Sequence, residues 1–499
     1  MRFATGASTA LLSALVLSGC TGFENAALRP GQENSERRLQ AARSPEEPFI
    51  LVALSGGGTR AAALGWSVLE VLKRANYTTP DGQSRRLIDD VAVLSSVSGG
   101  SVTAAYLGLR GPDGIDDMPD KFFRQHNIRW LVLRALNPYT WILLKSQGKS
   151  RIALEEELFD HRLFSGARLG QLNAAGAPLL ILNSTDMATG EVFSFTPERF
   201  EDICSDFDGE RVSVAVAASA AFPIAMSPVA LRNYSASACP DRPIPQWVAA
   251  HMASPFGRYT NLSEFKSVRY TYDLRRGGNG NAPGVSRQLD YLYLLDGGLA
   301  DNQGIHGLFQ ALSQDAPRII SGLQPNAEPE RLLQALNLGH LKKLVVIVVN
   351  ARADPRELVT TRAHRPGIVG MFQSVTSVPI DSVTASVNSA MEDLLEQLKQ
   401  AGGGGAGDPA FTGLRVYGVQ VDFDQFDASD PAQRQLQDEA KKIPTSWTIS
   451  ETEFDVLQKS ASALLDRNPC FQRLLIDVGG RPKADPAYAL KGCPQLCDP

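Results

Sequence analysis

A run of six apolar residues, Phe49–Leu54, constrains more than any other feature what this chain can fold into. A strand with no polar side chain must be covered on both faces, as strands are in the parallel sheets of α/β proteins. Similar apolar runs recur at residues 91–94, 179–182, 291–295 and 344–349. Helical periodicity lies between such runs, for instance over residues 59–74. The sequence therefore predicts an α/β domain with helices on both faces of a mostly parallel sheet.

The first twenty residues have the features of an export signal. Arg2 supplies a positive charge, and the apolar run Ala10–Leu17 that follows is too short to span a bilayer. The run ends in Leu-Ser-Gly-Cys20, which resembles the lipobox of bacterial lipoproteins. The resemblance implies a signal peptide over residues 1–19 and a lipid-modified Cys20. It also implies a lipid-anchored protein of the bacterial cell envelope, at the outer membrane or periplasmic face rather than in the cytoplasm. The alternative is an ordinary signal peptide with Cys20 as a bystander thiol.

Composition divides the remainder of the chain. Residues 20–48 are polar and proline-containing, which is typical of a tether between a membrane anchor and a domain. Residues 49–352 are predicted to form the main domain. Within it, about 224–289 is rich in Pro, Asn, Ser and Gly and is predicted to be an insertion, a candidate cover for the site. Residues 353–499 are predicted to be a C-terminal extension packed on that domain.

Charge and cysteine content exclude two classes of function. The chain has 49 basic and 54 acidic residues, a net charge of −5, and no basic block, so nucleic acid is not an expected partner. Five cysteines follow Cys20, an odd number, and disulfides can form in an exported protein. No metal site is predicted, because the last two cysteines have no histidine or second pair nearby. The candidate bridges, between which the sequence does not choose, are Cys204 with Cys239 and Cys470 with Cys493 or Cys497.

Residues 55–60, Ser-Gly-Gly-Gly-Thr-Arg, lie between a predicted strand and a predicted helix. Glycines at that place let backbone N–H groups face an anion at the N-terminus of the helix. The Gly-Lys-Ser/Thr ending of a nucleotide phosphate loop is absent. A tight strand-to-helix turn is the alternative interpretation.

Two further motifs supply a nucleophile and a base. Residues 95–101, Ser-Ser-Val-Ser-Gly-Gly-Ser, resemble the Gly-x-Ser-x-Gly nucleophile elbow, with Ser98 at its tip and Ser96 in place of the first glycine. Asp296, followed by two glycines, closes the strand predicted at 291–295, and the carboxyl ends of strands face the side where α/β sites form. The small residues of 217–223 would let a helix pack closely beside the elbow.

Together, in this order, these motifs resemble the patatin-like phospholipase family over residues 49 to about 350. The resemblance implies a three-layer α/β/α sandwich and a lipid acyl-ester hydrolase of the phospholipase A or lipase type. Its role would be lipid catabolism or envelope lipid remodelling, its substrate a membrane lipid, and it would need no cofactor or metal. Departures from the family pattern are Ser96, Ala61 and the long gap between Pro223 and Asp296.

The resemblance assigns roles residue by residue. Ser98 is the nucleophile and Asp296 is the base that takes its proton directly. The backbone N–H groups of the glycine loop form the oxyanion hole. The other residues implied are Gly56, Gly57 and Gly58 for the oxyanion hole, with Arg60, Gly99 and Gly297 in supporting positions.

Two other functions remain open, and one segment has two interpretations. A Ser–His–Asp triad could use His306, His340 or His364, and a catalytically silent envelope lipoprotein could bind lipid or protein. The apolar segment Trp130–Leu144 suits either a surface at a lipid interface or a pair of short core helices. The sequence makes no prediction of the oligomeric state.

Overall fold

The computed structural model describes residues 23–35, 44, 46–146, 148–173, 177–223, 225–245, 248–249, 262–277, 288–305, 341–352 and 413–493. The predicted signal peptide and Cys20 lie outside the described residues, as do His306, His340 and His364.

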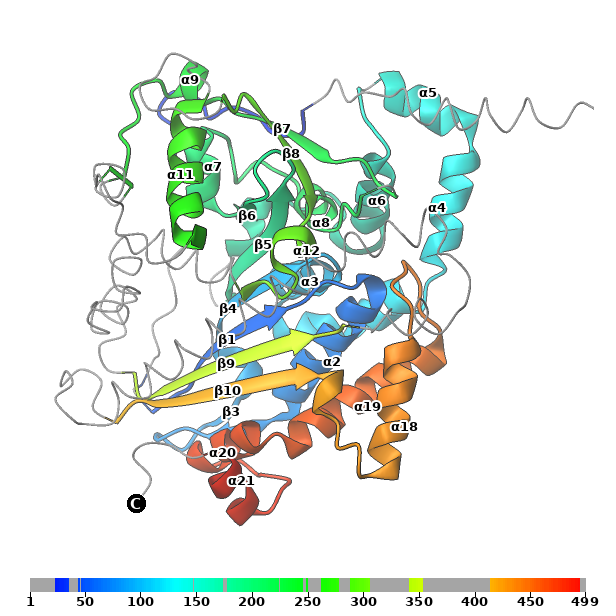
Figure 1. The fold of residues 1–499 in the computed structure, drawn as a ribbon, viewed down its shortest axis with the longest axis vertical. Helices are drawn as coiled ribbons and strands as arrows, with labels where there is room; N and C mark the ends of the chain where they lie inside the picture. Colours follow the sequence, from blue (N-terminus) through cyan, green and yellow to red (C-terminus); the bar gives the residue numbers. More distant parts are fainter. Residues whose placement is uncertain are drawn as a thin grey trace, which may run out of the picture.

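An eight-stranded sheet runs through the centre of the molecule (Figure 1). Its order is β10-β9-β1-β4-β5-β8-β7, and β6 pairs with β5. A separate two-stranded sheet joins β2 to β3. The strands are β1 (Phe49–Leu54), β2 (Asn76–Thr78), β3 (Ser84–Arg86), β4 (Val91–Val97), β5 (Leu179–Asp186), β6 (Val192–Phe195), β7 (Val229–Arg232), β8 (Tyr291–Asp296), β9 (Lys343–Asn350) and β10 (Arg415–Asp422).

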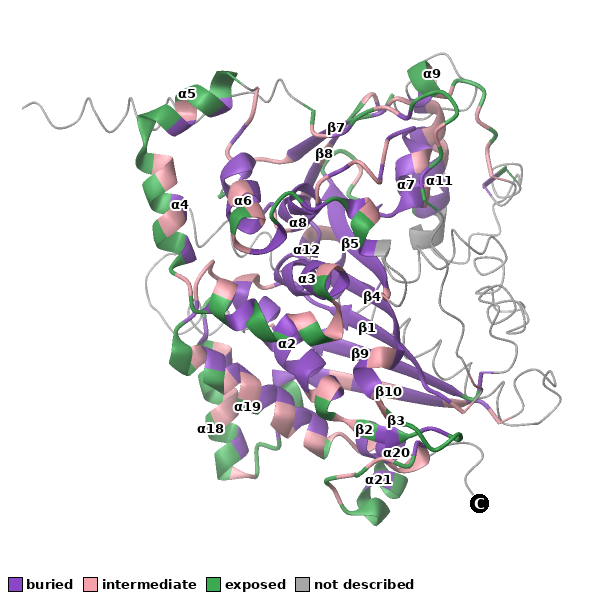
Figure 2. Cartoon of the chain, turned by 180° about the vertical axis from the view of Figure 1, so that it is seen from behind, coloured by how far each residue is buried: buried purple, intermediate pink, exposed green. Residues whose placement is uncertain are grey.

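Helices flank this sheet, which confirms the predicted three-layer α/β/α class. Figure 2 shows α2 and α19 on one side of it, with their inner faces buried. The described helices are α2 (Gly58–Arg74), α3 (Gly99–Gly114), α4 (Asn127–Leu136), α5 (Pro138–Ser146), α6 (Ile152–Phe159), α7 (Pro197–Asp202), α8 (Val212–Ser219), α9 (Ser235–Ala238), α11 (Leu262–Gly277), α12 (Gly298–Asp301), α18 (Pro431–Lys442), α19 (Glu451–Arg467), α20 (Pro469–Asp477) and α21 (Pro486–Gly492).

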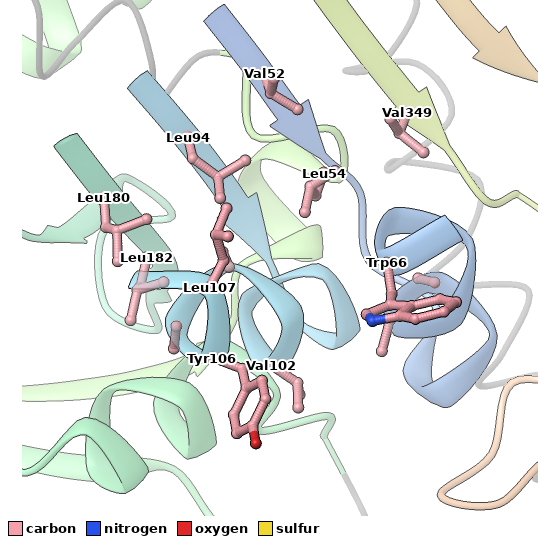
Figure 3. Close-up of a cluster of buried hydrophobic side chains, with 14 of the residues drawn as sticks. Val52, Leu54, Trp66, Leu94, Val102, Tyr106, Leu107, Leu180, Leu182 and Val349 are labelled. Carbon is pink, nitrogen blue, oxygen red and sulfur yellow. The ribbon is translucent and has the colours of Figure 1, made fainter. Parts of the chain in front are cut away.

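The apolar strands lie in the middle of the sheet because only there are both faces covered. Every residue of β1, β4 and β9 is buried, and β1 pairs in parallel with both neighbours. Figure 3 shows side chains of these strands packing against Trp66 on α2 and against Val102, Tyr106 and Leu107 on α3. The mostly parallel arrangement predicted from the apolar runs is therefore confirmed.

Beyond β5 the sheet changes direction. β8 pairs antiparallel with β5, and β7 antiparallel with β8. The register sets Asp296, the last residue of β8, opposite Ser184 of β5, while Val97, the last residue of β4, lies opposite Asn183. β4 and β8 thus run toward each other and end one register step apart.

Residues 413–493 contribute to the same sheet and core. β10 pairs in parallel with β9 over eight residues, and α19 packs against α2. β7 and α11 lie within the stretch 224–289. The domain boundaries at 49, 352 and 353 stay predictions. Among the described helices, none is long and apolar enough to cross a membrane.

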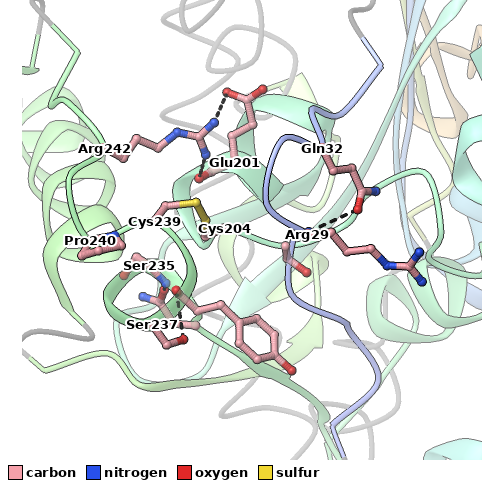
Figure 4. The surroundings of a disulfide bond; sticks show 12 residues. Arg29, Gln32, Glu201, Cys204, Ser235, Ser237, Cys239, Pro240 and Arg242 are labelled. Carbon is pink, nitrogen blue, oxygen red and sulfur yellow. Dashed lines mark hydrogen bonds and ion pairs between the residues drawn. A yellow bond between two sulfur atoms is a disulfide. The ribbon is translucent and has the colours of Figure 1, made fainter.

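Two disulfides join residues from the candidate pairs. Cys204 bonds to Cys239 across 35 residues of sequence, and Cys470 bonds to Cys493 across 23. Figure 4 shows the first bridge beside the ion pair of Arg242 with Glu201. Each bridge closes a loop in the unfolded chain, which lowers the entropy gained on unfolding. Cys497 lies outside the described residues.

We expect the double variant Cys470→Ser/Cys493→Ser to lose about 3 kcal/mol of unfolding free energy, the amount that the chain-entropy model gives for a loop of this length. Denaturant unfolding with and without reductant measures the loss, and reductant should destabilise the wild type more than the variant. Thiol titration of the unfolded, unreduced wild type is the control. If Cys470 and Cys493 react there as free thiols, the bridge does not form.

Candidate active site

Ser98 sits at a strained turn between β4 and α3. Its φ of 51° and ψ of −121° lie outside the regions that a residue with a side chain prefers. Such strain costs about 1–3 kcal/mol and persists only where the surroundings hold it. Here the Ser98 N–H donates to Ser219 Oγ on α8 at 2.9 Å. The turn has the geometry predicted for a nucleophile elbow.

A chain of hydrogen-bonded, buried hydroxyl groups stabilises the turn. Ser219 Oγ donates to the backbone oxygen of Asn183 at 2.5 Å and lies 2.8 Å from Ser101 Oγ. Ser101 Oγ in turn lies 3.0 Å from Ser96 Oγ. Serine at 96 therefore fits where the family pattern has glycine, because its hydroxyl has a hydrogen-bond partner inside the packed turn.

Asp296 ends β8, which runs opposite to β4, and its side chain contacts Ser98. Ser98 Oγ donates to Asp296 Oδ2 at 2.8 Å, and the Gly298 N–H donates to Oδ1 at 2.8 Å. Thr185 Oγ1 fixes the backbone oxygen of Asp296 at 2.9 Å. Burial raises the pKa of Asp296 to about 6, although its bonds from Gly298 and Ser98 lower it. The geometry is that of a serine with a carboxylate base.

The glycine loop leaves two backbone donors for an anion. Gly56 N–H already donates to the oxygen of Asn302 at 2.9 Å, and Thr59 N–H to the oxygen of Ser446 at 2.9 Å. Among the described residues, the N–H groups of Gly57 and Gly58 have no acceptor. Both residues have positive φ, 134° and 63°, and stand at the N-terminus of α2, where N–H groups point outward.

Glycine allows close approach at Gly56, which was predicted for the oxyanion hole, and at the supporting positions Gly99 and Gly297. A Cβ on Gly56 would lie 3.2 Å from Ser98 Cβ, and one on Gly99 would lie 1.9 Å from the Gly58 oxygen. A Cβ on Gly297 would lie 2.3 Å from the Asn183 oxygen. The contribution of Gly56 is thus a missing side chain rather than a free N–H group.

Arg60 supports the loop and is fully engaged in doing so. Its Nε donates to the oxygen of Ala351 at 2.8 Å, and its two terminal nitrogens donate to the oxygen of Ile443 and to Thr445 Oγ1. Burial lowers the pKa of Arg60 to about 10. These bonds favour the supporting position predicted for Arg60.

Glu155 on α6 is a titratable residue of this region that the sequence motifs did not identify. It is buried, its Oε1 accepts from Trp447 Nε1 at 2.7 Å, and its Oε2 has no hydrogen-bond partner among the described residues. Burial raises the pKa of Glu155 to about 8; the Trp447 N–H lowers it, and the charge of Asp296 raises it. Only the tertiary structure brings residues 155, 296 and 447 together, so no local signal could have indicated this carboxyl.

No histidine among the described residues contacts the pair. Both carboxylate oxygens of Asp296 are occupied, by Ser98 and by Gly298. In the part of the chain that the structure describes, no cluster of His, Cys, Asp or Glu is arranged to hold a metal ion.

A comparison with protein-family models decides the family. The model of the patatin-like phospholipases matches residues 52–309, just over half of the 499 residues. The chain belongs to the patatin-like phospholipase family. The matched span contains the elbow, the glycine loop and Asp296. No curated protein sequence matches the chain.

Solved structures resemble this patatin-like chain only distantly. Human GIVD cytosolic phospholipase A2 has a TM-score of 0.41 and 11% identity over 88% of this chain, which spans 64% of that protein. The same human enzyme with methyl gamma-linolenyl fluorophosphonate gives 0.39 and 12%, covering 88% of this chain and 60% of that one. VipD from Legionella pneumophila gives 0.27 and 11%, covering 90% and 75%. Likeness at this level identifies no function.

The two buried carboxyls predict a bell-shaped pH profile for kcat/KM. Asp296 accepts a proton only as a carboxylate, so activity should rise as pH increases through about 6. Above about 8 Glu155 ionises beside Trp447, whose neighbour Ser446 contacts the glycine loop, and its negative charge should disfavour an oxyanion formed at that loop, so activity should fall. Glu155→Gln keeps the acceptor for Trp447 but cannot ionise. Its profile should keep the acid limb and lose the alkaline limb; an unchanged alkaline limb would exclude Glu155 as the cause.

Proposed function

We propose that the chain is a serine acyl-ester hydrolase that acts on membrane lipids through a Ser98–Asp296 dyad. The observation that carries the proposal is the 2.8 Å hydrogen bond from Ser98 Oγ to Asp296 Oδ2, formed at a strained turn. A serine hydroxyl is a weak nucleophile, and an adjacent base removes its proton as it attacks. Membership of the patatin-like phospholipase family supports a lipid as the substrate.

The reaction follows from the positions of these groups. Asp296 takes the proton of Ser98 Oγ while the oxygen bonds to the acyl carbon, and the ester carbonyl becomes an oxyanion. The N–H groups of Gly57 and Gly58 are the donors available for that charge. The intermediate collapses as the carbon–oxygen bond to the leaving alcohol breaks, and the alcohol takes the proton from Asp296. Water then attacks the acyl-serine with Asp296 again as base, which releases the fatty acid and restores Ser98.

Replacing either member of the dyad should abolish activity. Ser98→Ala should lower ester hydrolysis by at least about 10³-fold, as loss of a catalytic serine does elsewhere. Asp296→Asn, which has nearly the same shape but cannot take the proton, should lower kcat by about 10²–10⁴-fold. The measurements are turnover of a short-chain ester and labelling by a serine-reactive phosphonate.

Ser67→Ala is the matched control for these variants. Ser67 is buried, and its hydroxyl bonds to Ala63 within α2, so its loss should leave turnover unchanged. Near-normal turnover of Ser98→Ala would refute the dyad. A wild type that neither hydrolyses esters nor reacts with the phosphonate would favour the silent lipid-binding lipoprotein instead.

We further propose that the enzyme works in the bacterial cell envelope, in lipid catabolism or envelope lipid remodelling, anchored through lipidated Cys20. The support is the order of positive charge, apolar run and lipobox in residues 2–20. More than one acyl chain on Cys20 would give stable anchoring, since each buried methylene contributes about 0.8 kcal/mol.

Cys20→Ser should block lipidation. Expressed in a bacterial host, the wild type should enter the detergent phase on phase separation. The variant should stay in the aqueous phase, or should keep the size of the uncleaved precursor. Cys497→Ser is the control and should partition as the wild type does. Equal partition of the wild type and Cys20→Ser would show that Cys20 is not the membrane anchor.

A further inference from the structure

Helices α4 and α5 form a hairpin whose outer face is apolar. Of the thirteen large hydrophobic residues that the structure describes as exposed, seven lie within these two short helices. Leu136 and Ile142 are 69% and 66% exposed. Figure 2 shows this run of exposed residues along the edge of the molecule. The outer face comprises Ile128, Val132, Leu133, Leu136, Tyr139, Ile142 and Leu143.

The inner face of the hairpin is firmly packed, so the exposure of the outer face is a feature of the fold. Leu131 and Leu144 are buried in a cluster with Leu158 of α6. Trp130 stacks on His161, and Trp141 Nε1 donates to the oxygen of Ala135 at 2.7 Å. The segment Trp130–Leu144 is therefore core on one face only: the tryptophans pack inward, and a separate set of aliphatic residues is exposed.

The stretch that forms the hairpin is basic. Residues 121–154 contain seven Lys and Arg residues and no Asp or Glu, in a chain whose net charge is −5, and four of the seven pair with carboxylates from outside the stretch. Arg129 on α4 and Lys145 on α5 are exposed and have no carboxylate partner among the described residues. A surface that is apolar with positive flanks complements anionic lipid. A second copy of this chain would instead oppose like charges.

The hairpin stands on the side of the molecule where the site lies. The parallel strands β1, β9 and β10 point toward α4, and Ser98 and the glycine loop follow the carboxyl ends of β4 and β1 (Figures 1 and 2). α6 packs against α4 on one side and against α8, which carries Ser219, on another.

We propose that the outer face of α4 and α5 docks onto an anionic lipid surface and so brings the substrate to Ser98. The proposal rests on the proposed function for the class of substrate. The two helices lie in the headgroup region with Leu133, Leu136 and Ile142 in contact with acyl chains. Arg129 and Lys145 contact lipid phosphates beside them.

The test is binding to vesicles by the full chain carrying Cys20→Ser, so that the lipid anchor does not contribute. In that background, Leu133→Ser/Leu136→Ser/Ile142→Ser should lower partition onto phosphatidylglycerol vesicles by about tenfold or more, because apolar contact drives such binding. Hydrolysis of vesicle lipid should fall in parallel, while turnover of a soluble short-chain ester stays at the wild-type level. Leu490→Ser, an exposed leucine on α21, is the matched control and should change neither.

The charged residues give a separate measurement. Arg129→Gln/Lys145→Gln should weaken binding to phosphatidylglycerol vesicles severalfold and leave binding to phosphatidylcholine vesicles unchanged. Added salt should weaken the wild type more than this variant, because screening acts on the charges that the variant lacks.

The outcomes separate this proposal from the proposed function. Unchanged vesicle binding by the triple serine variant would overturn the docking surface even if Ser98→Ala is inactive. If the wild type has no esterase activity but its vesicle binding depends on the outer face, the docking surface is supported and the proposed enzymatic function is refuted. A triple variant that changes from dimer to monomer in light scattering without losing vesicle binding would assign the face to a second copy instead.

Discussion

The site depends on β4 and β8, which run toward each other along β5 and end at neighbouring positions. β4 runs toward the site in the parallel part of the sheet, and β8 runs toward it from the antiparallel part. Because the strands end one register step apart, Ser98, which follows β4, and Asp296, which ends β8, fall within a hydrogen bond of each other. Neither loop length nor a third residue is needed to bring the serine hydroxyl and the carboxylate together. The strain at Ser98 is tolerated because Ser219, on a helix packed over the same strands, fixes its N–H.

The N-terminus of α2 is the second fixed point, and the C-terminal part of the chain holds it. Ser446 accepts from Thr59, Arg60 donates to Ile443 and Thr445, and Gly58 is in close contact with Ser446. Residues 443–447 thus accept from Thr59 and Arg60, next to the proposed oxyanion position, and leave the N–H groups of Gly57 and Gly58 without an acceptor among the described residues. A buried guanidinium that bonds to carbonyl and hydroxyl oxygens adds a positive charge near a position where negative charge develops. The same segment carries Trp447, which holds Glu155.

The sequence predicted what depends on local pattern. The apolar runs marked β1, β4, β5 and β9 because strands covered on both faces exclude polar residues. The run at 291–295 marked β8 as well, although one face of β8 is only partly covered. The motifs pointed to Ser98 and Asp296, which the structure brings into contact. The direction of β8 could not be predicted, because the same apolar run fits a parallel and an antiparallel strand. Asp296 was chosen by a rule for parallel strands, yet its strand is antiparallel to β5. The engagement of the Gly56 N–H by Asn302 and the burial of Glu155 against Trp447 depend on contacts between distant residues, which no local spacing encodes.

Helix α6 lies between the exposed α4–α5 hairpin and the site around Ser98 and Asp296. On α6, Leu154 and Leu158 lie one turn apart and pack with Leu131 and Leu144 under the α4–α5 hairpin. The neighbouring residue Glu155 turns instead toward Trp447 and the charge of Asp296. An apolar face that is exposed to water adds no hydrophobic stabilisation, and an exposed apolar patch of this kind marks a site that binds a protein, a membrane or a ligand. Since α6 has eight residues and is packed on both sides, a bilayer resting on the hairpin would sit at a fixed position relative to Ser98.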